Sequence, residues 1–152
     1  MTGNPQCTPQ AIAEAAAQAM WAEDRASRAL GMELVSVGPG RASLRMTVRA
    51  DMCNGYHLCH GGMIFSLADS AFAFACNSHN KVTVANNCSV AFLTSARAGD
   101  VLTAEAIERH RGGRSGVYDV TVTDQAGRTI AIFRGHSTQI KGELVPGLTA
   151  ES

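Results

Sequence analysis

The feature that most constrains this chain is an apolar run, Met63 to Cys76, which follows two glycines and contains one charged residue. The run has no proline and is rich in Ala, Phe and Leu, so at this length its composition favours a helix over a strand. Apolar residues occur on all its sides, which is typical of a buried helix. The rest of the chain must therefore supply a cover for this helix.

The polar residues of this helix fall on one narrow stripe. Ser66, Asp69, Ser70 and Ala73 are spaced i, i+3, i+4 and i+7, and the stripe carries no Lys, Arg or Glu. An unpaired carboxylate in an apolar interior is unfavourable, so Asp69 requires a reason to be there. Either neighbouring N–H groups or side chains satisfy it structurally, or it is a catalytic carboxylate, and on this feature alone both interpretations stand.

The start of the helix favours the catalytic interpretation. The first N–H groups of a helix have no intrahelical partner, and Gly61 and Gly62 let a ligand approach them closely, so an oxyanion can bind there. Asp69 lies about 12 Å further along the axis and cannot easily serve that oxyanion. Two such helices packed antiparallel about a two-fold axis bring each Asp69 toward the partner's glycines. We therefore predict a dimer with two composite sites.

The flanking sequence predicts one further helix and a sheet. Thr8 and Pro9 indicate a helix from about Pro9 to Leu30, ended by Gly31. A sheet with one apolar helix must wrap around that helix, so we predict an α+β fold with a curved antiparallel sheet, a long central helix and an extra N-terminal helix. The tail from Glu143 is expected to be loose. The expected strands are Met32–Val37, Arg41–Val48, Lys81–Leu93, Val101–His110, Ser115–Thr123 and Arg128–Ile140.

Length and charge restrict the class of protein. A chain of 152 residues suits a single domain, 1–152, with its core at about 32–140. The net charge is zero, which gives no electrostatic case for binding nucleic acid or an anionic membrane. No apolar run reaches membrane-spanning length without a charge, and the N-terminus does not resemble a secretory signal. Five cysteines without a repeated spacing indicate reduced thiols, so we expect a cytoplasmic protein.

The loop before the central helix contains four potential metal ligands within eight residues: Cys53, His57, Cys59 and His60. Zinc sites usually draw their ligands from two separated clusters, and a single crowded loop fits that pattern poorly. The glycines that follow also have a better use as an oxyanion site. We therefore expect no metal and no other cofactor.

Three segments together resemble a known family. They are HGGMIFSLADSAFAFACNS, the turn at Gly99-Asp100 and the stretch RSGVYDV. This combination resembles the PaaI-type acyl-CoA thioesterases of phenylacetate catabolism, over about Met32 to Ile140. The resemblance implies the hotdog fold and hydrolysis of aryl-acyl-CoA thioesters, namely phenylacetyl-CoA and its ring-hydroxylated derivatives, to the free acid and CoA. It also implies a homotetramer built as a dimer of dimers.

The resemblance also assigns roles within the loop and helix. The family's acid falls on Asp69, its oxyanion donor on the Gly61 N–H, and the Asn and His of its loop on Asn54 and His60. Asp69 of the partner chain would attack the carbonyl to give a mixed anhydride or act as a general base on water, and the sequence leaves both routes open. Asn54 can position water or the carbonyl, while His60 either orients the thioester or hydrogen-bonds within the loop.

Candidates for substrate binding lie on the helix and on the hairpin between the fourth and fifth strands. Gly62, Phe65 and Ser70 adjoin the proposed catalytic positions, although small residues such as Ser70 equally suit helix packing. Basic side chains near the hairpin can hold the phosphates of CoA, although a solvated position at the hairpin tip is the more common role for any one of them. Arg111 and Arg114 are the main candidates, with Arg109, Lys81 and Arg134 as further ones.

Two other functions remain as alternatives. A hotdog dehydratase or hydratase needs a His paired with an acid in a different arrangement, and the central helix has no His. A non-catalytic acyl-CoA binding module would keep the groove for CoA but could dispense with Asp69. An acid on an apolar helix that begins with Gly61-Gly62 favours the thioesterase over both.

Overall fold

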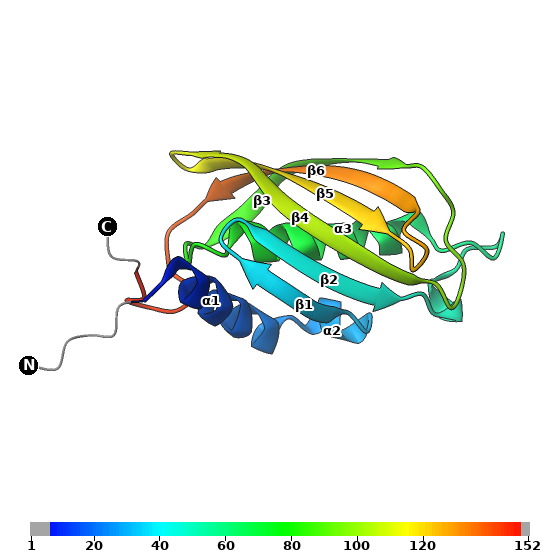
Figure 1. The fold of residues 1–152 in the computed structure, drawn as a ribbon, viewed down its shortest axis with the longest axis horizontal. Helices are drawn as coiled ribbons and strands as arrows, with labels where there is room; N and C mark the ends of the chain where they lie inside the picture. The colour runs from blue at the N-terminus through cyan, green and yellow to red at the C-terminus, as the bar shows by residue number, and fades with distance from the viewer. Residues whose placement is uncertain (1–6, 150–152) are drawn as a thin grey trace, which may run out of the picture.

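One antiparallel sheet of six strands curves around a central helix in this computed structural model, which describes residues 7–149 (Figure 1). The predicted order of helix, two strands, helix and four strands is confirmed. The elements are α1 (Pro9–Glu23), α2 (Arg25–Ala29), β1 (Glu33–Gly38), β2 (Arg41–Thr47), the 3-10 turn η1 (Ala50–Met52), α3 (Gly61–Cys76), β3 (Thr83–Phe92), β4 (Val101–Gly112), β5 (Ser115–Thr123) and β6 (Thr129–Gln139).

The strand order across the sheet is β1-β2-β4-β5-β6-β3. After β2 the chain crosses the concave face as α3 and then adds β3 at the far edge, so β1 and β3 are the two edge strands (Figure 1). The predicted alternation in β2 is confirmed, because Leu44, Met46 and Val48 are all buried. β2 therefore presents apolar side chains to α3 and polar side chains outward.

The concave face of the sheet covers one side of α3. Phe72 packs between Tyr118 and Phe133, with ring centroids 5.5 and 5.8 Å away, and a Cβ at Gly135 would lie 2.8 Å from its ring. The helix residues buried on this side are Ile64, Leu67, Ala68, Ala71, Phe72, Phe74 and Ala75.

The opposite side of α3 is only partly covered. Ser66, Asp69 and Ala73 are half-buried, and Gly62 is exposed. The expectation of a helix buried on all sides is therefore wrong for one protomer, because a single open sheet cannot close around a helix. The uncovered stripe is the predicted stripe of small and acidic residues.

The N-terminal helix begins as predicted but is interrupted. The Thr8 hydroxyl accepts the Ala11 N–H at 3.1 Å, which caps α1. One continuous helix to Leu30 is wrong, because Asp24 ends α1 and caps α2 by accepting the N–H and the hydroxyl of Ser27 at 2.9 and 2.7 Å. Gly31, at φ +70°, follows α2 as expected of a helix end.

The tail is held in place rather than loose as far as Leu148. Buried Asn80, at φ +63°, donates from its side-chain amide to the carbonyls of Val145 and Leu148, both at 2.8 Å. Its side-chain oxygen accepts the Val145 N–H at 2.8 Å.

Among the helices of residues 7–149, none has the length and apolar character needed to cross a bilayer.

Candidate active site

The loop before α3 is organised by Asn54. Its side-chain oxygen accepts the N–H groups of Tyr56 and Leu58 at 2.9 and 3.2 Å. Its backbone N–H donates to the Leu58 carbonyl at 2.8 Å, and its carbonyl accepts the His57 N–H at 3.0 Å. The side-chain NH₂ of Asn54 donates to no group within the described chain, so it remains available to a ligand.

His60 caps the start of α3. Its Nδ1 accepts the Gly62 N–H at 2.9 Å, so the proton of the neutral ring is on Nε2. The structure thus provides the hydrogen bond within the loop that the sequence had left as one of two roles for His60. Because Gly62 is already paired, the unpaired donor at this helix end is Gly61, whose N–H has no acceptor within residues 7–149.

A cleft of about 320 Å³ lies beside this helix start. Gly61 and Asn54 both border it, as does the segment that follows β3. The Phe92 ring lies against Gly61, because a Cβ placed there would be 3.1 Å from it. This wall could not be predicted from the sequence, since the end of an edge strand carries no motif. The lining residues are Asn54, Leu58, Cys59, Gly61, Ile64, Phe92, Leu93, Thr94 and Ser95.

Asp69 lies on the uncovered stripe of α3, about two turns from Gly61. No donor among residues 7–149 contacts its carboxylate, so the structural interpretation, satisfaction by neighbouring groups, finds no hydrogen bond within the protomer. Burial raises the pKa of the Asp69 carboxyl above its usual range. Asp69 does not border the cleft, so a single protomer does not bring it together with Gly61 and Asn54.

The other two helix candidates have contacts within the protomer. The Ser70 hydroxyl lies 2.7 Å from the Ser27 hydroxyl of α2, so it links the two helices. The Phe65 ring is half-buried and packs edge-on against Phe133, with centroids 5.4 Å apart. Neither residue borders the cleft at Gly61.

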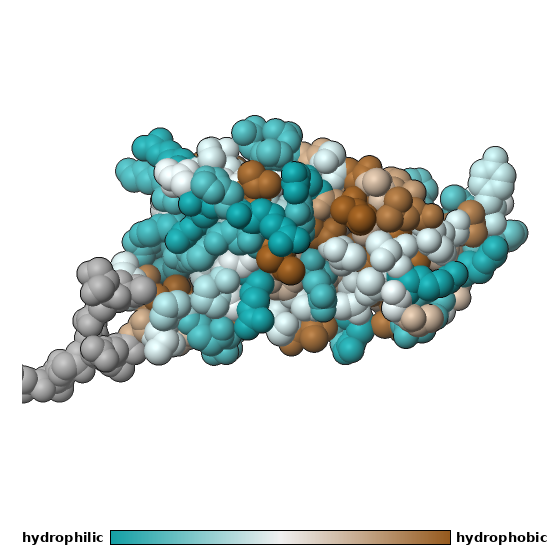
Figure 2. Space-filling view, turned by 45° about the horizontal axis from the view of Figure 1, so that its top comes forward, coloured by the Kyte–Doolittle hydropathy of each residue, from teal (hydrophilic) through white to brown (hydrophobic). Residues whose placement is uncertain are grey.

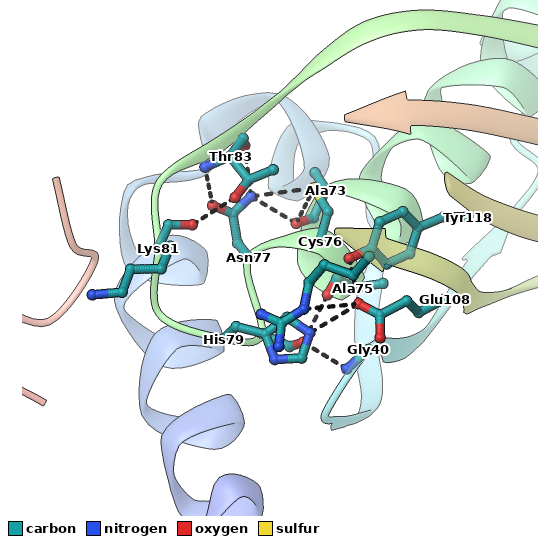
Figure 3. Close-up of polar contacts among 12 residues, drawn as sticks. Gly40, Ala73, Ala75, Cys76, Asn77, His79, Lys81, Thr83, Glu108 and Tyr118 are labelled. Carbon is teal, nitrogen blue, oxygen red and sulfur yellow. Dashed lines mark hydrogen bonds and ion pairs between the residues drawn. The ribbon is translucent and has the colours of Figure 1, made fainter. Parts of the chain in front are cut away.

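The C-terminal end of α3 is tied to the hairpin of β4 and β5 by polar side chains (Figure 3). Glu108 of β4 accepts hydrogen bonds from the Tyr118 hydroxyl at 2.8 Å and from His79 Nε2 at 3.0 Å. The Asn77 side chain donates to the carbonyls of Ala73 and Thr83 at 2.8 and 2.9 Å. The contact between His79 and Glu108 thus joins the segment after α3 to β4, while the Asn77 side chain joins the end of α3 to the start of β3.

The basic candidates of the hairpin separate into two groups. Arg109 and Arg134 both pair with Asp119, at 2.9 and 2.6 Å, on the outer face of the sheet. Arg111 and Arg114 instead border a small hollow beneath the hairpin tip, which His79 and Lys81 also border. Arg114 forms no ion pair within the described chain, and Arg111 is 3.7 Å from Glu108.

The crowded Cys and His loop does not form a metal cluster. Within residues 7–149, no three side chains of His, Cys, Asp or Glu are placed to hold a metal ion together. His57 has a positive φ of 61° and lies at the exposed tip of the loop, while His60 is engaged as the helix cap.

Comparison with known proteins identifies the class. The model of the thioesterase superfamily matches residues 56–131, which include α3 and most of the sheet. The chain therefore belongs to the thioesterase superfamily; it has the hotdog fold and is a thioester hydrolase.

The particular proteins it is similar to include the acyl-coenzyme A thioesterase PaaI of Escherichia coli (strain K12). Identity is 48% over 128 residues, covering 84% of this chain and 91% of PaaI. The solved structure of E. coli PaaI, a protein of the phenylacetic acid degradation operon, matches with a TM-score of 0.88 at 46% identity and covers 90% and 99% of the two chains. A Streptococcus mutans protein solved with acetyl CoA matches with a TM-score of 0.70 at 28% identity, over 74% and 90%.

The raised pKa of Asp69 predicts how the stability of the protein depends on pH. Between the unfolded value, about 3.9, and the higher folded value, the folded state binds more protons, so the free energy of unfolding falls as pH rises through this window. Asp69→Asn imitates the protonated form. We expect the variant to be more stable than the parent at pH 7 and equal to it below the window, as measured by urea unfolding at fixed protein concentration.

Asp119→Asn is the matched control with the opposite sign. The hydrogen bond from Arg134 lowers the pKa of Asp119, and Arg109 adds to this while burial opposes it. Its stabilising effect is present above the unfolded pKa and is lost as pH falls through the folded one. Asp119→Asn should therefore be less stable than the parent at pH 7. Equal or reduced stability of Asp69→Asn at pH 7 would contradict the account of Asp69.

Proposed function

We propose that this protein hydrolyses acyl-CoA thioesters at a site composed from two protomers. The observation that carries the proposal is the arrangement on α3. Gly61 borders a cleft, and its N–H has no acceptor within residues 7–149. About two helical turns later lies the half-buried carboxylate of Asp69, which accepts no hydrogen bond within the same residues. A thioesterase needs both groups, one for the oxyanion and one for the nucleophile, and one protomer keeps them apart.

The edge strand β3 supports an antiparallel pairing of two protomers. Within residues 7–149, β3 is hydrogen-bonded to β6 alone, and its other edge is open for pairing. Figure 2 shows apolar side chains on the surface in this region, where Phe92, Leu93 and Ile132 are 52%, 56% and 48% exposed. Pairing of β3 with its copy about a two-fold axis would continue the sheet and set the two α3 helices antiparallel, with Asp69 toward the partner's Gly61. We further propose that two such dimers form a tetramer and that the protein acts in the cytoplasm.

The reaction would proceed by addition at the thioester carbonyl. The Gly61 N–H, assisted by the helix dipole, binds the developing oxyanion, and the free NH₂ of Asn54 positions the carbonyl or the water. In the general-base route, Asp69 takes a proton from water, the resulting hydroxide attacks the carbonyl, and the C–S bond breaks to release CoA. In the nucleophilic route, an Asp69 oxygen attacks the carbonyl carbon and the C–S bond breaks, which releases CoA and leaves a mixed anhydride. Water then hydrolyses the anhydride to the free acid and the Asp69 carboxylate, and its proton passes to the CoA thiolate. Burial raises the pKa of Asp69, which makes it a stronger base in either role.

The proposed substrates are CoA esters of aryl acids, phenylacetyl-CoA and its ring-hydroxylated derivatives. The similarity to PaaI and the acetyl CoA bound by the S. mutans relative support this class. In the antiparallel dimer, the hairpin of one protomer lies toward the helix start of the other. Arg111 and Arg114 are therefore placed to hold phosphates of a CoA whose thioester reaches the partner's Gly61. Gly62, Phe65 and Ser70 stay candidates for contacts with the acyl part.

Loss of the Asp69 carboxylate should abolish turnover without abolishing binding. We expect Asp69→Asn to lower kcat by roughly 10²–10⁴-fold, the range for losing a positioned base, with the affinity for substrate kept. Release of the CoA thiol is measured with phenylacetyl-CoA, hydroxyphenylacetyl-CoA and a straight-chain acyl-CoA. Ser66→Ala, one turn away on the same stripe, is the control and should keep its activity.

Three outcomes would decide against parts of this proposal. Turnover that survives in Asp69→Asn would remove Asp69 from the chemistry. Tight binding without turnover by the parent would favour an acyl-CoA binding module. A faster straight-chain substrate would overturn the aryl class.

A single turnover in ¹⁸O-labelled water separates the two routes, because direct attack by water labels only the product acid, while hydrolysis at the Asp69 carbonyl of an anhydride labels the enzyme.

The two arginines that border the hollow beneath the hairpin tip predict how CoA is recognised. Removing one charged contact to a phosphate should raise KM by about tenfold or more in Arg111→Ala or Arg114→Ala, with kcat little changed. With an acyl-pantetheine substrate, which lacks the nucleotide phosphates, both variants should behave as the parent does. Arg134→Ala, whose side chain pairs with Asp119 on the outer face, is the control. An equal loss with both substrates would contradict a phosphate role.

A further inference from the structure

The two cysteines of the loop before α3 face each other across its base. Cys53 and Cys59 form an isolated antiparallel bridge. The N–H of the residue after each cysteine donates to the carbonyl of the residue before the other, at 2.8 Å in both cases. The two hydrogen bonds thus flank the pair rather than join it, which makes Cys53 and Cys59 a non-hydrogen-bonded pair, the type with the shorter separation between backbones.

This backbone geometry suits a disulfide. Residues in such pairs have Cα atoms about 4.5 Å apart and side chains on the same face, and disulfides form at Cα separations of about 4.4–6.8 Å. Both cysteines are reduced here. The Cys53 thiol contacts the Arg49 carbonyl at 3.6 Å, and the Cys59 thiol contacts the His60 carbonyl at 3.7 Å. These long, weak contacts do not hold the thiols apart, so rotation about each Cα–Cβ bond suffices to join them.

We propose that Cys53 and Cys59 form a reversible disulfide by exchange with a small-molecule disulfide such as oxidised glutathione. The Cys53 thiolate attacks one sulfur of oxidised glutathione, whose S–S bond breaks and releases one glutathione thiolate. The Cys59 thiolate then attacks the Cys53 sulfur of the mixed disulfide and displaces the second glutathione. Two protein thiols are oxidised, one small disulfide is reduced to two thiols, and the two protons pass to the released glutathione.

The burial of the two thiols sets the order of these steps. Cys53 is half-buried and accessible to a small oxidant, whereas Cys59 is only 6% exposed. Burial, together with the nearby Cys53 and Asp100, raises the pKa of Cys59 to about 11. Cys53 is therefore the thiol that reacts first, and Cys59 is the resolving thiol. The resolving step should become faster as pH rises toward that value, since only the thiolate is nucleophilic.

The position of the pair connects it to the cleft. A disulfide would close a ring of seven residues, 53–59, around the turn that Asn54 organises. Cys59 itself borders the cleft, and the next residue caps α3. Oxidation would thus fix both the loop and the start of the helix. That consequence for catalysis rests on the proposed function, whereas formation of the disulfide does not.

The disulfide is tested by equilibrating the protein with glutathione buffers of graded ratio, quenching with an alkylating agent and mapping the peptides. Chymotrypsin cleaves the unfolded chain after Tyr56, which lies between the two cysteines. The expected result is one linked pair of peptides containing Cys53 and Cys59, with the other three cysteines alkylated, and full reversal by dithiothreitol. Alkylation of both Cys53 and Cys59 at every glutathione ratio, or a bond between any other two cysteines, would overturn the proposal.

Single substitutions separate an internal disulfide from simple surface oxidation. Cys59→Ser should trap glutathione on Cys53, because the resolving thiol is missing. Cys53→Ser should leave buried Cys59 unmodified. Cys88→Ser is the matched control, since Cys88 is also half-buried but lies on β3, and it should form the linked peptides as the parent does. A glutathione adduct that persists on Cys53 in the parent would overturn the proposal.

Failure of the disulfide and failure of the proposed function are distinguishable. Acyl-CoA turnover is compared before and after oxidation and after reduction. If the linked peptides form but no acyl-CoA is hydrolysed in either state, the proposed function fails and the disulfide stands. If turnover is found but no linked peptides form, the reverse holds.

Discussion

Phe72, in the C-terminal half of α3, packs between Tyr118 and Phe133 directly over Gly135, and this contact holds the helix on the concave face of the sheet. Aromatic burial of this kind is among the larger stabilising contributions in a small domain. Because one sheet covers only one side, the opposite stripe of the helix remains open. Asp69 lies on that stripe, so the packing that holds the fold together also leaves an acid without a partner.

The same packing places the start of α3 at the border of a cleft, where local hydrogen bonds divide the donors. His60 takes the Gly62 N–H, and this leaves Gly61 as the donor facing the cleft. The loop is held by Asn54 and closed at its base by the pair Cys53 and Cys59. One short segment thus carries an unpaired backbone N–H at a cleft, a free side-chain amide and two cysteines that face each other.

Much of this arrangement could be predicted from the sequence, because it depends on local patterns. The bounds of α3, the alternation of β2 and the cap at Thr8 follow from periodicity and from the chemistry of helix ends. The family resemblance groups Asn54 with Gly61, and both residues border one cleft, on a loop and the helix that follows it.

The features that sequence could not provide depend on contacts between distant residues. The helix break at Asp24 is followed by Ser27, whose hydroxyl contacts that of Ser70 on α3. The tail is held by Asn80, which lies 65 residues before its partner Val145. The wall formed by Phe92 reaches Gly61 only because β3 crosses to the far edge of the sheet. No spacing of residues in the sequence predicts these contacts.

Subunit complementation tests the composite site most directly. Asp69→Asn removes the acid, and Gly61→Val obstructs the oxyanion position beside Phe92, so each variant alone should be inactive. When the two are unfolded together and refolded, about half of the dimers are mixed, and each mixed dimer keeps one intact site, so roughly a quarter of the parent activity should return. If both groups acted within one protomer, no mixture would regain activity, and the account of a shared site would be wrong.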